Sequence, residues 1–143
     1  MRRLLLLVLI VPLASGCGWA SLFLGSHPTS PPQHEALAAQ VTRSIPRWKA
    51  QEHLPPKAYP GAMIFATAGC TACHTYDGAG GSNLNAPDLT AIGRRHLGIR
   101  FQIAHLKCPS CVNPGSPMPP FGSLGRKRLH ELAIFLEASK GLR

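Results

Sequence analysis

The 143-residue sequence contains few of the large aromatic side chains from which small domains build a core, with only five Phe, two Trp and two Tyr. Pro and Gly are abundant instead, at 14 residues each, so much of the chain is expected to be loop. A small domain with so little large apolar surface is marginally stable on its own. We therefore expect an additional staple, such as a disulfide, a metal or a cofactor.

Acidic residues are also scarce, since six Asp and Glu stand against 15 Lys and Arg and give a formal net charge of +9. A basic protein suggests an acidic partner, such as nucleic acid, an anionic membrane or an acidic protein surface. The basic residues are spread along the sequence with no long Lys/Arg run, which disfavours nucleic acid. No internal repeat is visible, so the length predicts one domain with a leader.

No charged residue occurs in residues 4–24, which follow two N-terminal arginines. This arrangement is typical of a secretion signal. Small residues before Cys17 resemble the lipobox of bacterial lipoproteins, which implies a leader at residues 1–16 and lipidation of Cys17. The 21 uncharged residues are also long enough for an uncleaved membrane anchor. Both interpretations place the chain on the extracytoplasmic side of the bacterial cytoplasmic membrane (periplasm or cell surface); release from the membrane is the third alternative.

Residues 17–59 are expected to form a Pro-rich tether, because prolines at the density seen in residues 26–33 favour an extended spacer. A short helix is possible over residues 35–48, where Pro46 would end it. The compact domain is expected to start near Tyr59 or Pro60 and to occupy residues 60–143.

The stretch Cys70-Thr71-Ala72-Cys73-His74 has the form C-x-x-C-H. Two thiols at this spacing can each add to a vinyl group of one haem, and the next residue, His74, can then ligate the iron. One alternative is a thioredoxin-like redox pair, but no strand–helix–strand pattern surrounds the motif. Another is a zinc site shared with the second pair, Cys108 and Cys111, although the 34 intervening residues exceed the usual separation.

A Pro-rich stretch at residues 113–121 holds Met118 near its centre, 44 residues after His74. A stiff loop of this kind can hold a thioether sulfur in place, and His/Met ligation raises the reduction potential of haem iron. The alternative is that Met118 fills a gap in the core.

These motifs together resemble the class I cytochrome c family, including the small monohaem cytochromes and the cytochrome domains attached to haem-copper oxidases. The resemblance covers residues 60–142 and rests on pieces that occur in the family's order: Gly61 and Phe65, then Cys70, Cys73 and His74, then residues 86–90, residues 114–119 and residues 129–136. It implies one covalent haem c, with His74 and Met118 as the axial ligands of its iron. It also implies that the carbonyl of Pro87 accepts a hydrogen bond from His74, whereas an ordinary turn is the alternative for Pro87.

The expected fold is all-α: a small class I cytochrome c fold of three to four short helices and loops around the haem. Apolar residues recur with the helical period over residues 126–139, and residues 97–106 form another helix candidate. The resemblance implies that the last helix crosses the first one near Gly61, where the missing side chain lets the backbones approach.

Cys108 and Cys111 precede the Met118 loop, where the family does not require cysteines. Outside the cytoplasm they should form a disulfide; a redox-active or metal-binding pair, with His105 as a neighbour, is the alternative. Val112 stands where a second haem would need a histidine.

Three basic residues, Arg126, Lys127 and Arg128, fall in the first turn of the expected last helix, where the helix dipole disfavours cations. They form either a solvated face or a docking patch for an acidic redox partner. Arg94 and Arg95 either pair with the haem propionates or face solvent.

The expected function is therefore electron transfer between membrane-associated respiratory partners, either as a shuttle or as a subunit of an oxidoreductase complex. With both axial positions filled, no iron site is left for a substrate, so the chain is not expected to be an enzyme. The alternative is a haem enzyme or a gas or redox sensor in which Met118 dissociates. A thiol–disulfide protein that uses Cys108 and Cys111 is the third class.

Overall fold

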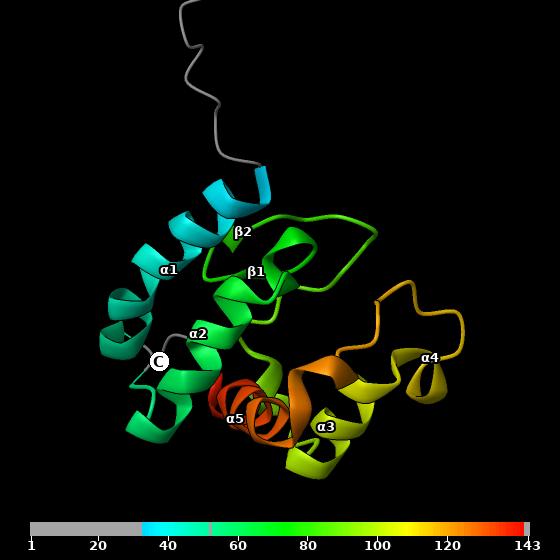
Figure 1. The fold of residues 1–143 in the computed structure, drawn as a ribbon. Helices are drawn as coiled ribbons and strands as arrows, with labels where there is room; N and C mark the ends of the chain where they lie inside the picture. The colour runs from blue at the N-terminus through cyan, green and yellow to red at the C-terminus, as the bar shows by residue number, and fades with distance from the viewer. Residues whose placement is uncertain (1–32, 52, 142–143) are drawn as a thin grey trace, which may run out of the picture. The chain divides into compact units, whose positions relative to one another are not determined.

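The computed structural model describes residues 33–51 and 53–141, which fall within a compact unit of residues 31–143. These described residues form α-helices, short 3-10 helices (η) and one two-stranded hairpin (Figure 1). In chain order the elements are α1 (Gln33–Gln51), η1 (Pro56–Ala58), α2 (Tyr59–Thr67), η2 (Cys70–Ala72), β1 (Thr75–Tyr76), β2 (Ala79–Gly80), η3 (Ile92–Arg95), α3 (Ile99–Lys107), α4 (Pro109–Val112), η4 (Gly122–Leu124) and α5 (Gly125–Ala138). The mostly helical structure is compatible with the all-α class expected from the sequence.

The expected leader, the alternative anchor at residues 4–24 and Cys17 lie outside the described residues. None of the helices in the described ranges is long and apolar enough to cross a membrane.

Helix α1 corrects the expected domain boundary, because residues that the sequence assigned to a tether belong to the compact unit. Val41, Ile45 and Trp48 recur on one face of α1 and are buried. Pro46 lies inside the helix rather than ending it. A proline in a helix interior costs about 3 kcal/mol, whereas burying three large apolar side chains contributes about 1.5–3 kcal/mol each, so packing outweighs the proline.

Four aromatic rings from four different elements form the centre of the core. Trp48 of α1, Phe65 of α2, Tyr76 of β1 and Phe135 of α5 are all at most 1% exposed. Their ring centroids lie 4.5–6.5 Å apart in every pairing, within the usual range for aromatic pairs. Four of the nine aromatic residues of this chain are therefore gathered at one place, which joins α1 to the rest of the unit.

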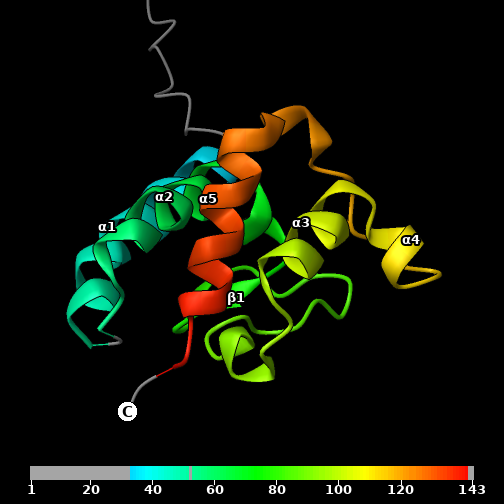
Figure 2. The same cartoon turned by 90° about the horizontal axis from the view of Figure 1, so that it is seen from below.

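Helices α2 and α5 cross at Gly61, as the resemblance implies. A Cβ atom at Gly61 would lie 2.6 Å from the Cβ of Phe135 and closer still to the backbone oxygen of Glu131. Only glycine allows this approach, because any side chain would push the two helices apart. Figure 2 shows α5 between α2 on one side and α3 on the other.

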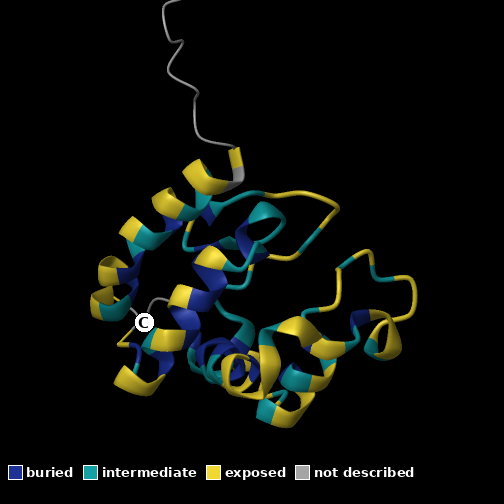
Figure 3. Ribbon diagram, in the orientation of Figure 1, coloured by how far each residue is buried: buried dark blue, intermediate teal, exposed yellow. Residues whose placement is uncertain are grey.

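The last two predicted helices are confirmed within one or two residues at each end: residues 97–106 correspond to α3 and residues 126–139 to α5. Buried residues lie on the inner faces of the helices, whereas the outer face of α1 and many loop residues are exposed (Figure 3). The hairpin of β1 and β2 follows the C-x-x-C-H stretch and packs against α1.

Candidate functional site

The C-x-x-C-H stretch forms a tight turn directly after α2. Gly69 ends the helix in a left-handed conformation (φ 91°), and η2 begins at Cys70. The backbone N–H groups of Cys73 and His74 both donate to the carbonyl of Cys70, at 3.2 and 2.9 Å. The turn therefore places the two thiols and the imidazole in one short segment, within a single turn of backbone.

Both thiols of this turn are free, with Cys70 buried and Cys73 partly exposed. Cys108 and Cys111, at the same spacing, are joined in a disulfide instead, which is the pairing that the sequence favoured. The four cysteines therefore do not converge on one zinc ion in this structure. Within residues 33–51 and 53–141, no group of three His, Cys, Asp or Glu side chains is arranged to hold a metal ion.

Backbone and amide groups from residues 81–83 hold the turn in place. Gly81 N–H donates to the carbonyl of Thr71 at 2.7 Å, and the Asn83 side chain donates to the carbonyl of Ala72 at 2.6 Å. A third bond runs from Asn83 N–H to the carbonyl of Cys73 at 3.2 Å. Because backbone groups and one side-chain amide make these bonds, the turn is fixed without using either thiol or the imidazole.

The imidazole of His74 is oriented by a hydrogen bond to Pro87, whose backbone oxygen lies 2.8 Å from Nδ1. A carbonyl oxygen can only accept, so Nδ1 must carry the hydrogen. Nε2 then carries the lone pair and is the ring atom able to bind a metal. This is the contact that the resemblance implies for Pro87.

The segment of residues 86–90 lies along the turn through a series of further hydrogen bonds. Leu89 N–H donates to the carbonyl of Thr75 at 2.9 Å, and the Thr75 hydroxyl donates to Asp88 Oδ2 at 2.6 Å. Thr90 N–H donates to Asp88 Oδ1 at 2.9 Å, and the Thr90 hydroxyl accepts from Asp77 N–H at 2.7 Å. The carbonyl of Pro87 is thus held in position from the residues on its C-terminal side.

Asp88 is the acidic residue among the hydrogen-bonded groups of residues 86–90. Its partial burial raises the pKa, but hydrogen bonds from Thr75 and Thr90 outweigh this effect and leave the pKa below its ordinary value. The ionised form therefore stabilises the segment that carries Pro87.

Met118 lies on a separate segment, which is anchored to α3 and α4 rather than to the Cys70–His74 turn. Its side chain is partly buried and packs against the hydrophobic core. Its N–H donates weakly to the hydroxyl of Ser116 at 3.3 Å. The structure thus brings Cys70, Cys73, His74 and Pro87 together through hydrogen bonds, and it holds Met118 independently of them.

The interactions of Arg47 and His105 at this site were not predicted from the sequence. Arg47 of α1 binds Asp77 through an ion pair and a bond to its backbone oxygen, both at 2.9 Å, and so ties α1 to the hairpin after His74. Burial lowers the pKa of His105 on α3, and the charge of His74 lowers it further. The apolar stripe of α1 could have indicated that this helix packs against the domain, but no sequence signal indicates the pairing of Arg47 with Asp77.

A cavity of about 310 Å³ lies elsewhere, beside the C-terminal half of α5. Its lining includes His53, Lys57 and Lys140 but none of the predicted site residues. The chemistry-bearing side chains thus do not surround this cavity.

Comparisons of the chain with protein-family models, curated proteins and solved structures found no match.

Proposed function

We propose that this chain is an electron-transfer protein that carries one c-type haem, bound covalently through Cys70 and Cys73. The observation that carries the proposal is the state of the C-x-x-C-H turn. Both thiols are free, and the hydrogen bond from His74 to Pro87 leaves Nε2 available as a ligand. These groups fit a haem because two thioether bonds and one imidazole are the donors that a c-type haem requires.

A second line of support comes from the crossing of α2 and α5 at Gly61. The resemblance to class I cytochromes c implies this crossing, and a Cβ at Gly61 would be in collision with α5. We propose that the chain has that fold, in which the turn of residues 70–74 and the loop of residues 113–121 would together hold the haem.

The bound haem would supply one-electron chemistry through its iron, and the residues of this chain would set its properties. His74 would be an oriented and more basic ligand, because its Nδ1–H is held by a carbonyl. Met118 would supply a sulfur ligand that raises the reduction potential. With His74 and Met118 both bound to the iron, no position would be left for a substrate, which supports a carrier rather than an enzyme.

The covalent attachment is tested by the pyridine haemochrome spectrum and by extraction with acidic acetone. We expect pigment that stays with the protein after extraction, and we expect Cys70→Ser combined with Cys73→Ser to yield colourless protein. The matched control, Cys108→Ser with Cys111→Ser, removes the other pair at the same spacing and should retain its pigment. Loss of the wild-type pigment to the solvent would refute the proposal.

The sixth ligand is tested by Met118→Ala with Met63→Ala as the control. Met63 is 43% exposed on α2, so its truncation should leave the spectrum unchanged. Met118→Ala should abolish the weak far-red absorption band of Met–iron ligation and allow carbon monoxide to bind the reduced protein at neutral pH. Ready binding of carbon monoxide by the wild-type protein would favour the haem enzyme or gas sensor instead.

We propose that the partner is a redox protein with an acidic docking surface, which contacts Arg126, Lys127 and Arg128. These exposed residues occupy the start of α5, whose first turn has no acidic residue. Cations there oppose the helix dipole, and among the three only Lys127 has an ion pair within the described part of the chain, a 4.0 Å contact with Glu131. Reversal of the three charges should weaken the dependence of the electron-transfer rate on ionic strength. The control reverses three exposed basic residues on other elements: Arg43, Lys57 and Arg100.

The location proposed for the chain is the outer side of the cytoplasmic membrane, with Cys17 lipidated or residues 4–24 as an anchor. The disulfide between Cys108 and Cys111 supports an oxidising compartment. Labelling with a radioactive fatty acid distinguishes the two anchors. A lipoprotein should take up the label and lose it in Cys17→Ala, whereas a protein held by residues 4–24 should not be labelled.

A further inference from the structure

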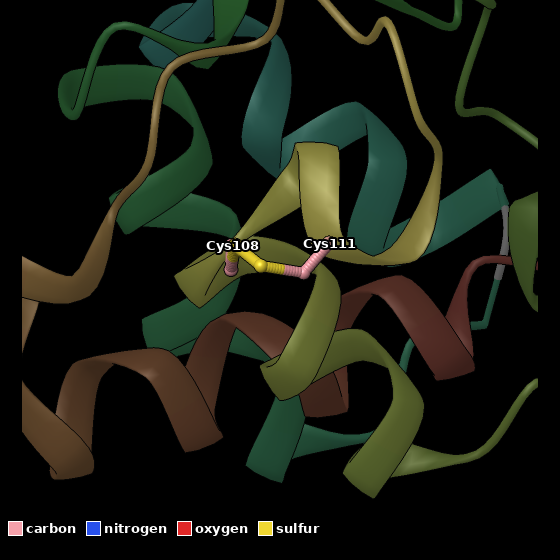
Figure 4. The surroundings of a disulfide bond; sticks show 2 residues. All are labelled: Cys108 and Cys111. Carbon is pink, nitrogen blue, oxygen red and sulfur yellow. A yellow bond between two sulfur atoms is a disulfide. The ribbon is translucent and has the colours of Figure 1, made fainter.

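The disulfide of Cys108 and Cys111 closes the corner between α3 and α4 (Figure 4). Cys108 follows the last residue of α3 and precedes the first residue of α4. Its N–H donates to Ala104 of α3 at 3.0 Å, and its carbonyl accepts from Cys111 N–H at 3.1 Å. The Cα atoms of the two cysteines are 5.3 Å apart, within the ordinary range for a disulfide.

The loop of residues 113–121 is anchored at both ends to this same corner. At its start, Asn113 N–H donates to the carbonyl of Pro109 at 2.8 Å. At its end, Phe121 N–H donates to the carbonyl of Leu106, also at 2.8 Å. Leu106 lies two residues before Cys108, and Pro109 directly follows it. The conformation of the corner therefore fixes where the loop leaves the domain and where it returns.

Inside the loop, few hydrogen bonds are possible. Four of its nine residues are prolines, which have no N–H to donate. The described bonds within it are those of Ser116 N–H to Asn113 at 3.0 Å and of Met118 N–H to the Ser116 hydroxyl at 3.3 Å. The prolines make the loop stiff, but the direction in which it holds Met118 depends on its two anchored ends.

The size of the disulfide ring indicates whether the bridge stabilises the whole protein or only the backbone near it. Stabilisation by a disulfide grows with the number of residues that it encloses in the unfolded chain. A bridge between residues i and i+3 encloses almost the smallest loop possible, so its effect on overall stability is small. Its effect on the backbone between Cys108 and Cys111 is direct, because the bridge restricts the dihedral angles of these residues.

We propose that Cys108 and Cys111 are positioning residues for Met118, and that their disulfide holds the Met118 loop in the geometry needed to ligate iron. This inference rests on the proposed function. Without the bridge, the α3–α4 corner relaxes, both anchors of the loop move apart and Met118 is displaced more easily. An external ligand then competes better for the iron, because the fraction of protein with an open position rises.

The test compares three haem-loaded proteins: wild type, C108S/C111S and Ser110→Ala. Ser110 is exposed between the two cysteines, so its substitution is a control that keeps the disulfide. Imidazole is titrated into each ferric protein, and its Kd is read from the Soret band. C108S/C111S should bind imidazole about tenfold more tightly and have a weaker far-red band, whereas Ser110→Ala should match the wild type. Equal affinities and equal bands in all three proteins would overturn the inference.

A second measurement serves if C108S/C111S does not mature. A dithiol reduces the disulfide of the wild-type holoprotein: the S–S bond breaks, each sulfur gains one electron and one proton, and the dithiol closes to its own disulfide. Iodoacetamide then caps the two thiols, and ferricyanide returns the iron to the ferric state. The capped protein should show the same gain in imidazole affinity, and an unchanged Kd would again overturn the inference.

Mass spectrometry of the capped protein distinguishes the two ways in which the inference can fail. Caps on Cys108 and Cys111 alone, with covalent pigment and unchanged imidazole binding, refute only the positioning role. Caps on Cys70 and Cys73 as well, with no Soret response to imidazole, refute the proposed function and the positioning role together.

Discussion

The two thiols of the C-x-x-C-H turn, although only three residues apart, have different surroundings. Cys70 is 7% exposed, and its burial raises its pKa to about 12, although a backbone hydrogen bond acts in the opposite direction. Cys73 is only partly buried. The thiolate is the reactive form of cysteine, so the folded chain protects one thiol more than the other.

We predict that iodoacetamide at neutral pH modifies Cys73 of the folded, haem-free chain at least about tenfold faster than Cys70, because the latter is both buried and protonated. Peptide mapping by mass spectrometry at several reaction times measures the two rates. In denaturant the rates should converge, which is the control. Equal rates in the folded chain would contradict the environment described for Cys70.

Asp88 illustrates how a single charge supports a backbone position. Its pKa lies below the ordinary value in the folded protein, because the hydrogen bonds from Thr75 and Thr90 outweigh partial burial. A carboxylate with a depressed pKa contributes stability above its unfolded pKa, and the contribution is lost as the pH falls through the folded value. The segment that carries Pro87 should therefore loosen in acid.

We predict that Asp88→Asn lowers the free energy of unfolding at pH 7 by about 1 kcal/mol, through weakened hydrogen bonds. The difference from wild type should shrink as the pH is lowered below about 4, where the wild-type carboxylate also becomes neutral. Urea unfolding over a pH series measures both effects. Glu35→Gln, at an exposed position on α1, should change stability by less, and a pH-independent effect of Asp88→Asn would argue against this role.

At the scale of elements, the contact between α2 and α5 depends on the missing side chain of Gly61. The Cβ that alanine would add at Gly61 meets the backbone of Glu131 and lies 2.6 Å from the Cβ of Phe135. Backbone atoms cannot move aside as the end of a flexible side chain can, so the helices themselves would have to shift.

We predict that Gly61→Ala destabilises the protein by about 1–3 kcal/mol, which is the usual cost of overpacking a well-packed interior. Gly122→Ala is the matched control, because nothing lies within 4 Å of the added carbon there. Thermal or denaturant unfolding of the two variants measures the difference. Equal stabilities would mean that α2 and α5 do not approach at Gly61.

At the scale of the whole molecule, α1 makes the compact unit larger than a domain that begins at residue 60. Trp48 belongs to the aromatic cluster, and Arg47 binds the hairpin after His74. The helix is therefore connected both to the core and to the segment that holds the candidate site. Its loss should affect the entire unit.

We predict that Trp48→Ala costs about 3–5 kcal/mol of stability, the range for truncating a large buried aromatic residue. Arg43→Ala, on the exposed face of the same helix, should change stability by less than about 0.5 kcal/mol. Chemical denaturation followed by circular dichroism provides both values. If the two variants were equally stable, α1 would be an independent helix on a tether, as the sequence had suggested.

The local features of this protein could be predicted from its sequence. Cys70, Cys73 and His74 lie within one turn of backbone, and the periodic apolar residues of α3 and of α5 each belong to a single helix. Such patterns are set by the geometry of consecutive residues, so they can be predicted without knowledge of distant segments. The disulfide between Cys108 and Cys111 has the same local character.

Packing between distant segments sets which parts of the chain belong to the compact unit and which groups meet. Pro46 would end an isolated helix, but α1 continues past it because Val41, Ile45 and Trp48 are buried against α2 and the hairpin. The hydrogen bond from His74 to Pro87 joins residues that are 13 positions apart in the sequence. The family resemblance implied this bond, but the local sequence pattern could not predict it. Both outcomes come from free energies summed over several elements, to which a local sequence pattern contributes only one part.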